Sequence, residues 1–311
     1  MTLIMHESYG FTNTGRKHFL LNRFYRLYPM YWVIFSFTLI VLFITGTEFA
    51  EEFHGAMLTP SALGEWVSNI LMVYPTFSPG SYIPRLLPPT WALNVEIAFY
   101  VLICLGISKT LKSTVLWSLA STLYVPVAFI CGLDAYSAFP LASLSFSMGA
   151  LTYYFYKKSH NVELLKKYSQ SKTSLLIAAV LITILMLLIY LMNFGAVNHV
   201  RGLYPLAFFG MIELSPIIIY HFAILKHAFS TGILNLDKQF GDFSYPIYLS
   251  HYLCGLLLAY LYSDASIRGG GTYSAQSALV CVMFSWGLIY FIDKPIQKIR
   301  AKVRNAATKI G

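Results

Sequence analysis

Residues 23–44 read RFYRLYPMYWVIFSFTLIVLFI, in which two arginines one helical turn apart precede a run from Trp32 to Ile44 that carries no charge. Together with the residues before it, this run is long enough to cross a bilayer as a helix. The i, i+3 spacing turns Arg23 and Arg26 to one side of that helix, and a guanidinium binds phosphate oxygens bidentately. The pair is either a fixed anion site at the membrane mouth or an interfacial anchor for lipid head groups, and both interpretations stay open.

The composition indicates that the whole chain, and not only this run, belongs in a membrane. Hydrophobic residues make up 57% and charged residues 11% of the 311 residues, and the mean hydropathy is +0.62. So little polar surface cannot cover a soluble globule of this length. The four cysteines show no CxxC spacing, so neither a disulfide framework nor a metal site is predicted. The predicted fold class is all-α, a polytopic membrane helix bundle.

Apolar stretches of about the length that a bilayer requires predict about eight transmembrane helices. They lie at residues 24–45, 90–107, 112–131, 137–156, 172–192, 201–222, 243–262 and 274–292. With a cytoplasmic N-terminus, all the lysines and arginines except Arg85, Arg201 and Arg268 fall on the cytoplasmic side. This asymmetry is what the positive-inside rule predicts for a correct span count. It also accounts for the formal charge of +9, so no nucleic-acid partner is predicted and membrane lipid is the expected surround.

The external connection from Gly46 to Pro89 is long and acidic, and it contains a short apolar piece from Trp66 to Tyr74. Because this piece is too short to span, we expect it to lie in the interface or to re-enter the membrane. Five prolines between residues 75 and 89 forbid regular helix until Thr90.

Three ionisable residues lie within predicted spans: Glu96, Glu213 and His251. Each costs several kcal/mol in hydrocarbon unless it faces a partner or a wet cavity, so they are candidates for proton transfer. A histidine beside a carboxylate is a usual general-base pair. The alternative is a hydrogen bond between helices that only holds the bundle together.

At these positions the chain resembles acyltransferase family 3, a family of integral-membrane O-acyltransferases. The resemblance rests on four motifs in the family's order: Arg23-Phe-Tyr-Arg26 with Leu-Tyr-Pro, Trp91-Ala-Leu-Asn-Val-Glu96, Ser244-Tyr-x-x-Tyr-Leu-x-His251 and Asp293-Lys-Pro295. It implies transfer of an acyl group, most often acetyl, from cytoplasmic acyl-CoA to a hydroxyl of a cell-surface carbohydrate such as lipopolysaccharide. It implies no bound cofactor and a multi-pass protein of the inner (plasma) membrane with both termini cytoplasmic.

The resemblance also assigns roles to the residues. Arg23 and Arg26 would bind the acyl-CoA donor, and Glu96 and His251 would line the catalytic cavity, His251 in a supporting role. Family members begin with a helix in which a basic residue precedes a catalytic histidine by eleven positions, and no such pair occurs here. We therefore expect residues 1–311 to form a single domain of this family that is incomplete at its N-terminus, lacking the first two spans.

A second class of function fits the same residues. A non-enzymatic carrier or flippase for a lipid-linked sugar or an organic anion would also need a basic cytoplasmic mouth, and could use Glu96 or Glu213 for proton coupling. Thioester cleavage separates the two classes, because only an acyltransferase releases free CoA from acetyl-CoA.

Overall fold

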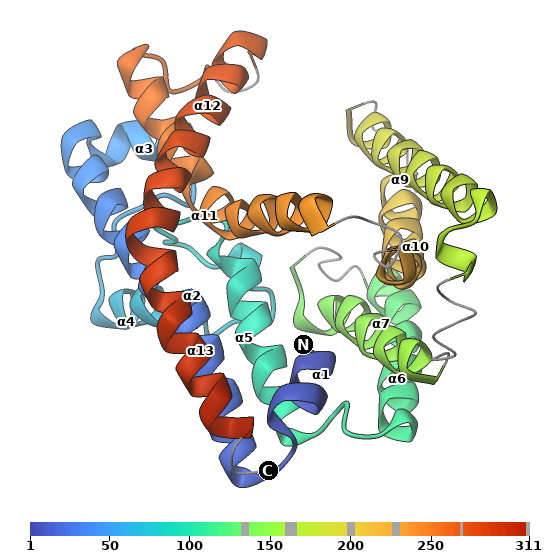
Figure 1. Ribbon diagram of the computed structural model, residues 1–311. Coiled ribbons are helices and arrows are strands. Elements are labelled where there is room, and N and C mark those ends of the chain that lie inside the picture. Colours follow the sequence, from blue (N-terminus) through green and yellow to red (C-terminus); the bar gives the residue numbers. More distant parts are fainter. Residues whose placement is uncertain (132–136, 159–166, 198–202, 226–230, 268–269, 309–311) are drawn as a thin grey trace. The chain divides into compact units, whose positions relative to one another are not determined.

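The computed structural model describes residues 1–131, 137–158, 167–197, 203–225, 231–267 and 270–308 (Figure 1). These ranges are mostly helical and contain no strand. The helices are α1 (Thr2–Ile4), α2 (Asn13–Thr45), α3 (Thr47–Phe53), α4 (Leu63–Leu71), α5 (Thr90–Leu105), α6 (Leu111–Ile130), α7 (Phe139–Lys158), α9 (Lys172–Val197), α10 (Leu203–Leu225), α11 (Thr231–Leu261), α12 (Gly271–Leu288) and α13 (Lys294–Thr308), with two π-helical turns, η1 (Met5–Tyr9) and η4 (Ile289–Asp293), and one 3₁₀ turn, η2 (Pro79–Ser81).

A helix occupies each of the eight predicted stretches in its described part, which confirms the all-α membrane fold. By length and apolar composition, four described segments qualify as membrane spans: Asn13–Thr45, Lys172–Phe194, Leu206–Leu225 and Gly271–Ala307. The count of eight spans stays a prediction. Arg201 and Arg268, two of the three basic residues predicted outside, lie beyond the described residues.

The chain forms two compact units. Unit 1 comprises residues 1–3, 106–136 and 140–236, and unit 2 comprises residues 4–105, 137–139 and 237–311. The prediction of a single domain stays a prediction, and each unit is described by itself.

Unit 1 is held together between its helices by small polar side chains. Trp117 Nε1 of α6 donates to Ser143 Oγ of α7 at 2.7 Å, and Ser121 Oγ lies 2.8 Å from the same hydroxyl. His221 Nε2 of α10 lies 2.9 Å from the Ser174 carbonyl oxygen of α9. Such bonds hold helices in a medium where apolar surface provides little attraction between them.

Unit 2 is built on α2 and α13, which run antiparallel and side by side (Figure 1). Asn22 Nδ2 donates to the Arg300 carbonyl at 3.1 Å, while further along α2 the Phe37 ring meets Phe284 of α12 at 5.5 Å. The Thr12 hydroxyl caps the start of α2 by accepting from the Gly15 N–H at 3.1 Å. This register brings the C-terminal helix beside the two arginines of α2.

The short helix α4 ends against the middle of α2. Three aromatic side chains of α2 donate to its last three carbonyls: Tyr28 Oη to Leu71 at 2.7 Å, Tyr31 Oη to Asn69, and Trp32 Nε1 to Ile70 at 3.0 Å. Trp32 lies thirteen residues before the end of α2 at Thr45, or roughly 20 Å at 1.5 Å per residue. Both predicted placements of this piece, in the interface or re-entering the membrane, stay predictions.

The segment after α4 lacks regular helix apart from η2 until α5 begins at Thr90, as the prolines predicted. Its backbone groups are satisfied by two buried side chains. Arg85 donates through Nε to the Pro88 carbonyl at 3.0 Å, and Asn69 bonds both the Pro84 carbonyl and the Leu86 N–H at 3.0 Å. Irregular backbone at membrane depth is tolerated only where such partners exist. Arg85, predicted as an external loop residue, is therefore a buried structural residue of this segment.

Candidate functional site

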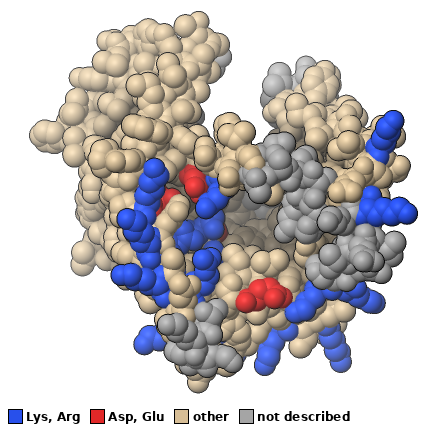
Figure 2. Space-filling view, viewed as in Figure 1, with Lys and Arg blue, Asp and Glu red and all other residues tan. Residues whose placement is uncertain are grey.

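A cavity of about 460 Å³ opens in unit 2 between η1, α2, α11 and α13. Its charged lining comprises five basic residues, Arg23, Arg26, Lys238, Arg300 and Arg304, and two acidic residues, Asp242 and Asp293. Figure 2 shows basic side chains gathered over α13 and the neighbouring part of α2, with acidic atoms beside them. The basic excess predicts an anionic ligand.

Arg23 is the innermost of these cations. It is 5% exposed, and its buried Nε has no hydrogen-bond partner. The guanidinium carbon lies 5.3 Å from the ring centroid of Phe19 and 5.4 Å from that of Tyr100, so cation–π contacts hold it in place. A buried donor without a partner costs about 1–3 kcal/mol, which a bound acceptor would recover.

Arg26 lines the same cavity as Arg23 but is exposed within it. The i, i+3 spacing thus brings both guanidiniums to one site. The burial of Arg23 argues against the alternative that the pair only anchors lipid head groups at the interface.

Lys238, Arg300 and Arg304 extend the basic lining, and the sequence did not single them out. Arg300 lies 278 positions after Asn22, yet its Nε lies 3.5 Å from the Asn22 Oδ1. In the described part of the chain, none of the five cations lies within 4.0 Å of a carboxylate oxygen. For Arg300 and Arg304, the sequence signal was their spacing with Gln297, which puts all three side chains on one face of α13.

Ser8 and Tyr9 of η1 also line the cavity, with Tyr9 near Arg300 and Arg304. Burial raises the pKa of the Tyr9 phenol, an effect that the nearby Arg23, Arg304 and Arg300 charges partly offset. Tyr9 is therefore a neutral hydroxyl donor at physiological pH.

Glu96 is not among the lining residues of this cavity, but two tyrosines connect its carboxylate to the lining. The Tyr100 phenol, one turn further along α5, donates a hydrogen bond to Glu96 Oε1. Tyr245 of α11, which lines the cavity, is within electrostatic reach of both Glu96 and Tyr100 and donates to the Leu27 carbonyl at 2.8 Å. Glu96 thus has a polar partner, and Arg23 is linked to it through the Tyr100 ring.

The structure does not bring His251 to Glu96. His251 is exposed, its Nδ1 lies 2.8 Å from the Tyr248 carbonyl of its own helix, and its ring meets Tyr252 at 4.4 Å. Tyr245 occupies the place beside Glu96, and a residue six positions later on an α-helix is turned about 120° away from it. The expected carboxylate–histidine pair is absent from the described residues, and a catalytic role for His251 stays a prediction.

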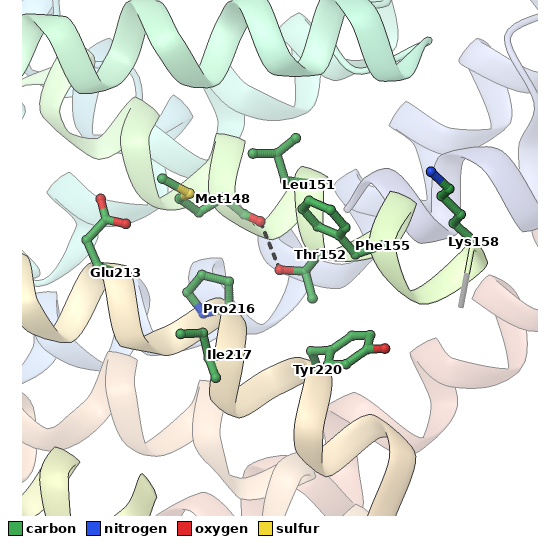
Figure 3. Close-up of a pocket in the computed structure, with 9 residues that line it drawn as sticks. All are labelled: Met148, Leu151, Thr152, Phe155, Lys158, Glu213, Pro216, Ile217 and Tyr220. Atoms are coloured by element: carbon green, nitrogen blue, oxygen red, sulfur yellow. Dashed lines mark hydrogen bonds between the residues drawn. The ribbon is translucent and has the colours of Figure 1, made fainter. Parts of the chain in front are cut away.

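Glu213 lies in unit 1, at a second cavity of about 600 Å³ between α7 and α10. Figure 3 shows the apolar side chains of Met148 and Ile217 near Glu213, with Lys158 at the other end of the row. This cavity is larger than the basic one, but with one carboxylate and one ammonium group it offers no cluster of anion ligands. In neither cavity, nor elsewhere in the described residues, do three metal-ligating side chains gather.

The helical fold with long apolar segments defines an integral-membrane protein, and its cavity in unit 2 has a basic lining. Comparison with known families decides within that class. A family model described as an acyltransferase domain, that of acyltransferase family 3, matches residues 2–292, and the chain belongs to this family. It is therefore a membrane acyltransferase by family. No curated protein and no solved structure shows significant similarity to the chain.

Proposed function

We propose that this protein transfers an acyl group, in the first place acetyl, from cytoplasmic acyl-CoA to a hydroxyl of a cell-surface carbohydrate. The observation that carries the proposal is the buried, unpartnered Arg23 Nε in a cavity with four further cations. The motif resemblance supports the carbohydrate acceptor and the plasma-membrane location with both termini in the cytoplasm.

The phosphate groups of the donor would bind first to Arg23 and Arg26. Two guanidiniums one turn apart can bind phosphate oxygens bidentately, and such charge-assisted bonds are about twice as strong as neutral ones. Because Tyr100 links Arg23 to Glu96, a donor held there brings its thioester arm toward the carboxylate.

Glu96 would act as the general base. The acceptor hydroxyl attacks the thioester carbon, so a C–O bond forms, the C–S bond breaks, and the hydroxyl proton passes to the Glu96 carboxylate. The CoA thiolate leaves and takes a proton, and the products are the carbohydrate ester and free CoA. Tyr100 would hold the carboxylate in position for this step.

The test is release of free CoA from acetyl-CoA by the purified full chain in detergent, with and without envelope carbohydrate. Acceptor-dependent thiol release supports the proposal. Binding of acetyl-CoA without any cleavage, together with its movement across a vesicle membrane, would instead identify a carrier.

The donor half of the proposal has its own test. The double variant Arg23→Ala/Arg26→Ala should lose measurable acetyl-CoA binding, and lysine at both positions should restore it only partly because the planar fork is lost. The matched control is Lys109→Ala/Lys112→Ala, which removes two exposed cations outside the cavity. Equal acetyl-CoA affinity in the arginine variant and the control would refute the assignment.

A further inference from the structure

The basic cavity of unit 2 is elongated along α13. Its lining includes Asp293 at the end of η4 and then Gln297, Arg300, Ala301 and Arg304, which lie on one face of α13. The first and last are eleven residues apart, or roughly 16 Å at 1.5 Å per residue. One diphosphate bound to Arg23 and Arg26 does not fill a site of this length.

Charge is distributed unevenly along this axis. Asp293 lies at one end, within electrostatic reach of Asp242 and also of Arg300 and Arg26, so part of the basic charge there is already balanced. Arg304 lies at the other end, one turn beyond Arg300, where Tyr9 is within reach of both arginines. The Arg304 end, away from the acidic pair, therefore favours a second anionic group.

Arg300 joins the two ends. It is within electrostatic reach of Arg23, Arg26 and Tyr9, and the Asn22 carboxamide holds its helix in register through the bond to the Arg300 carbonyl. Three guanidiniums that repel one another with no carboxylate in ion-pairing distance favour a ligand with several phosphate oxygens.

We propose that Arg300 and Arg304 form a second phosphate subsite, which binds a phosphomonoester separated from the diphosphate held by Arg23 and Arg26. This inference rests on the proposed acyl-CoA donor and deepens it: coenzyme A carries a diphosphate and, on its ribose, a separate 3′-phosphate. Tyr9 and Ser8 supply neutral hydroxyl donors at the same end. The subsite makes the protein selective for donors that carry the 3′-phosphate.

The experiment compares CoA with 3′-dephospho-CoA as ligands of the purified full chain, by calorimetry in detergent. Wild type should bind CoA roughly 10- to 100-fold more tightly, the ratio expected for charge-assisted bonds to one phosphate group. In Arg300→Gln/Arg304→Gln this ratio should fall to about one, because the affinity for CoA should fall further than the affinity for dephospho-CoA, which also senses the two lost charges of the shared cavity. The control Lys298→Gln/Lys302→Gln removes two exposed charges of the same helix that do not line the cavity, and should keep the wild-type ratio.

The outcomes separate this inference from the proposed function. Equal binding of the two ligands by wild type overturns the subsite and leaves the donor assignment standing, whereas no binding of either ligand overturns both. A further arm uses nanodiscs with and without anionic phosphatidylglycerol. If the glutamine variant changes lipid retention but not the ligand ratio, the arginines bind lipid head groups and the inference is wrong. The variant Arg300→Lys/Arg304→Lys keeps both charges and serves as a control for misfolding of the glutamine variant. Partial selectivity for CoA over dephospho-CoA in the lysine variant supports the subsite.

Discussion

Replacing Arg85 by methionine tests how much this side chain stabilises the irregular segment before α5. The Arg85 guanidinium donates to four carbonyls, those of Pro79, Gly80, Tyr82 and Pro88, at 2.6 to 3.0 Å. Methionine fills similar volume but donates nothing. We expect a loss of stability that is centred on residues 79–89.

The magnitude follows from the burial of those bonds. The bonds to Pro79 and Pro88 are buried, and the other two are partly buried, where water can replace the guanidinium. The Pro79 carbonyl keeps the Tyr82 N–H as a donor at 3.3 Å, whereas the Pro88 carbonyl loses its side-chain donor. One buried carbonyl without a donor costs about 1–3 kcal/mol, and weaker bonding at Pro79 adds to this cost. Removing a buried charge returns part of its desolvation cost, so the net loss is about 1–3 kcal/mol. That is a substantial share of the 5–15 kcal/mol typical of a whole domain.

The assay is unfolding of the purified protein by a denaturing detergent titrated against a mild one. Local opening is measured in parallel as the thiol-labelling rate of Ser81→Cys with and without Arg85→Met. Ser81→Ala is the control, because it removes only an exposed bond to the Ser78 carbonyl in the same segment. Arg85→Lys should recover part of the loss, since one nitrogen cannot serve Pro88 and the η2 carbonyls together.

Unfolding of Arg85→Met within about 0.5 kcal/mol of wild type, the range of surface substitutions, would contradict a stabilising role for Arg85. Equal labelling of Ser81→Cys with and without Arg85→Met would contradict it as well. Arg85 is absent from the lining of the basic cavity, so acetyl-CoA affinity measured on the folded fraction should stay unchanged.

Three further results are expected. Tyr100→Phe should lower turnover about tenfold by freeing the Glu96 carboxylate, the value of one hydrogen bond, with little change in acetyl-CoA affinity; a changed affinity at constant turnover would contradict the positioning role. Tyr31→Phe should destabilise by about 1–2 kcal/mol because its bond to α4 is buried, and by more than Tyr28→Phe, whose bond is exposed; thermal unfolding in detergent decides the order. Hydrogen bonds from the Ser61 and Ala62 N–H groups and the Ser61 hydroxyl lower the pKa of the Glu65 carboxyl. The stabilisation that Glu65 gives to the first turn of α4 is therefore present above the ordinary pKa of about 4.5 and is lost as the pH falls through the lowered pKa. Faster amide exchange in that turn at acidic pH should disappear in Glu65→Gln.

Features that depend on local pattern could be predicted from the sequence. Apolar length and composition predicted the helices, proline spacing predicted where α5 begins, and the i, i+3 spacing placed Arg23 and Arg26 in one cavity. The pairing of Tyr100 with Glu96 at i, i+4 was also readable from the sequence, although it was not singled out.

Contacts between elements that are distant in the sequence depend on how the helices pack. The basic cavity needs Arg300 beside Asn22, a contact set by the antiparallel packing of α2 and α13 and by no local spacing. Tyr245 and not His251 lies beside Glu96 because the rotation of α11 against α5 selects one face of the helix. The position of α4 along α2 likewise follows from three aromatic side chains of α2 that donate hydrogen bonds to its last carbonyls. Such a match between two helices cannot be read from the spacing of residues along the sequence.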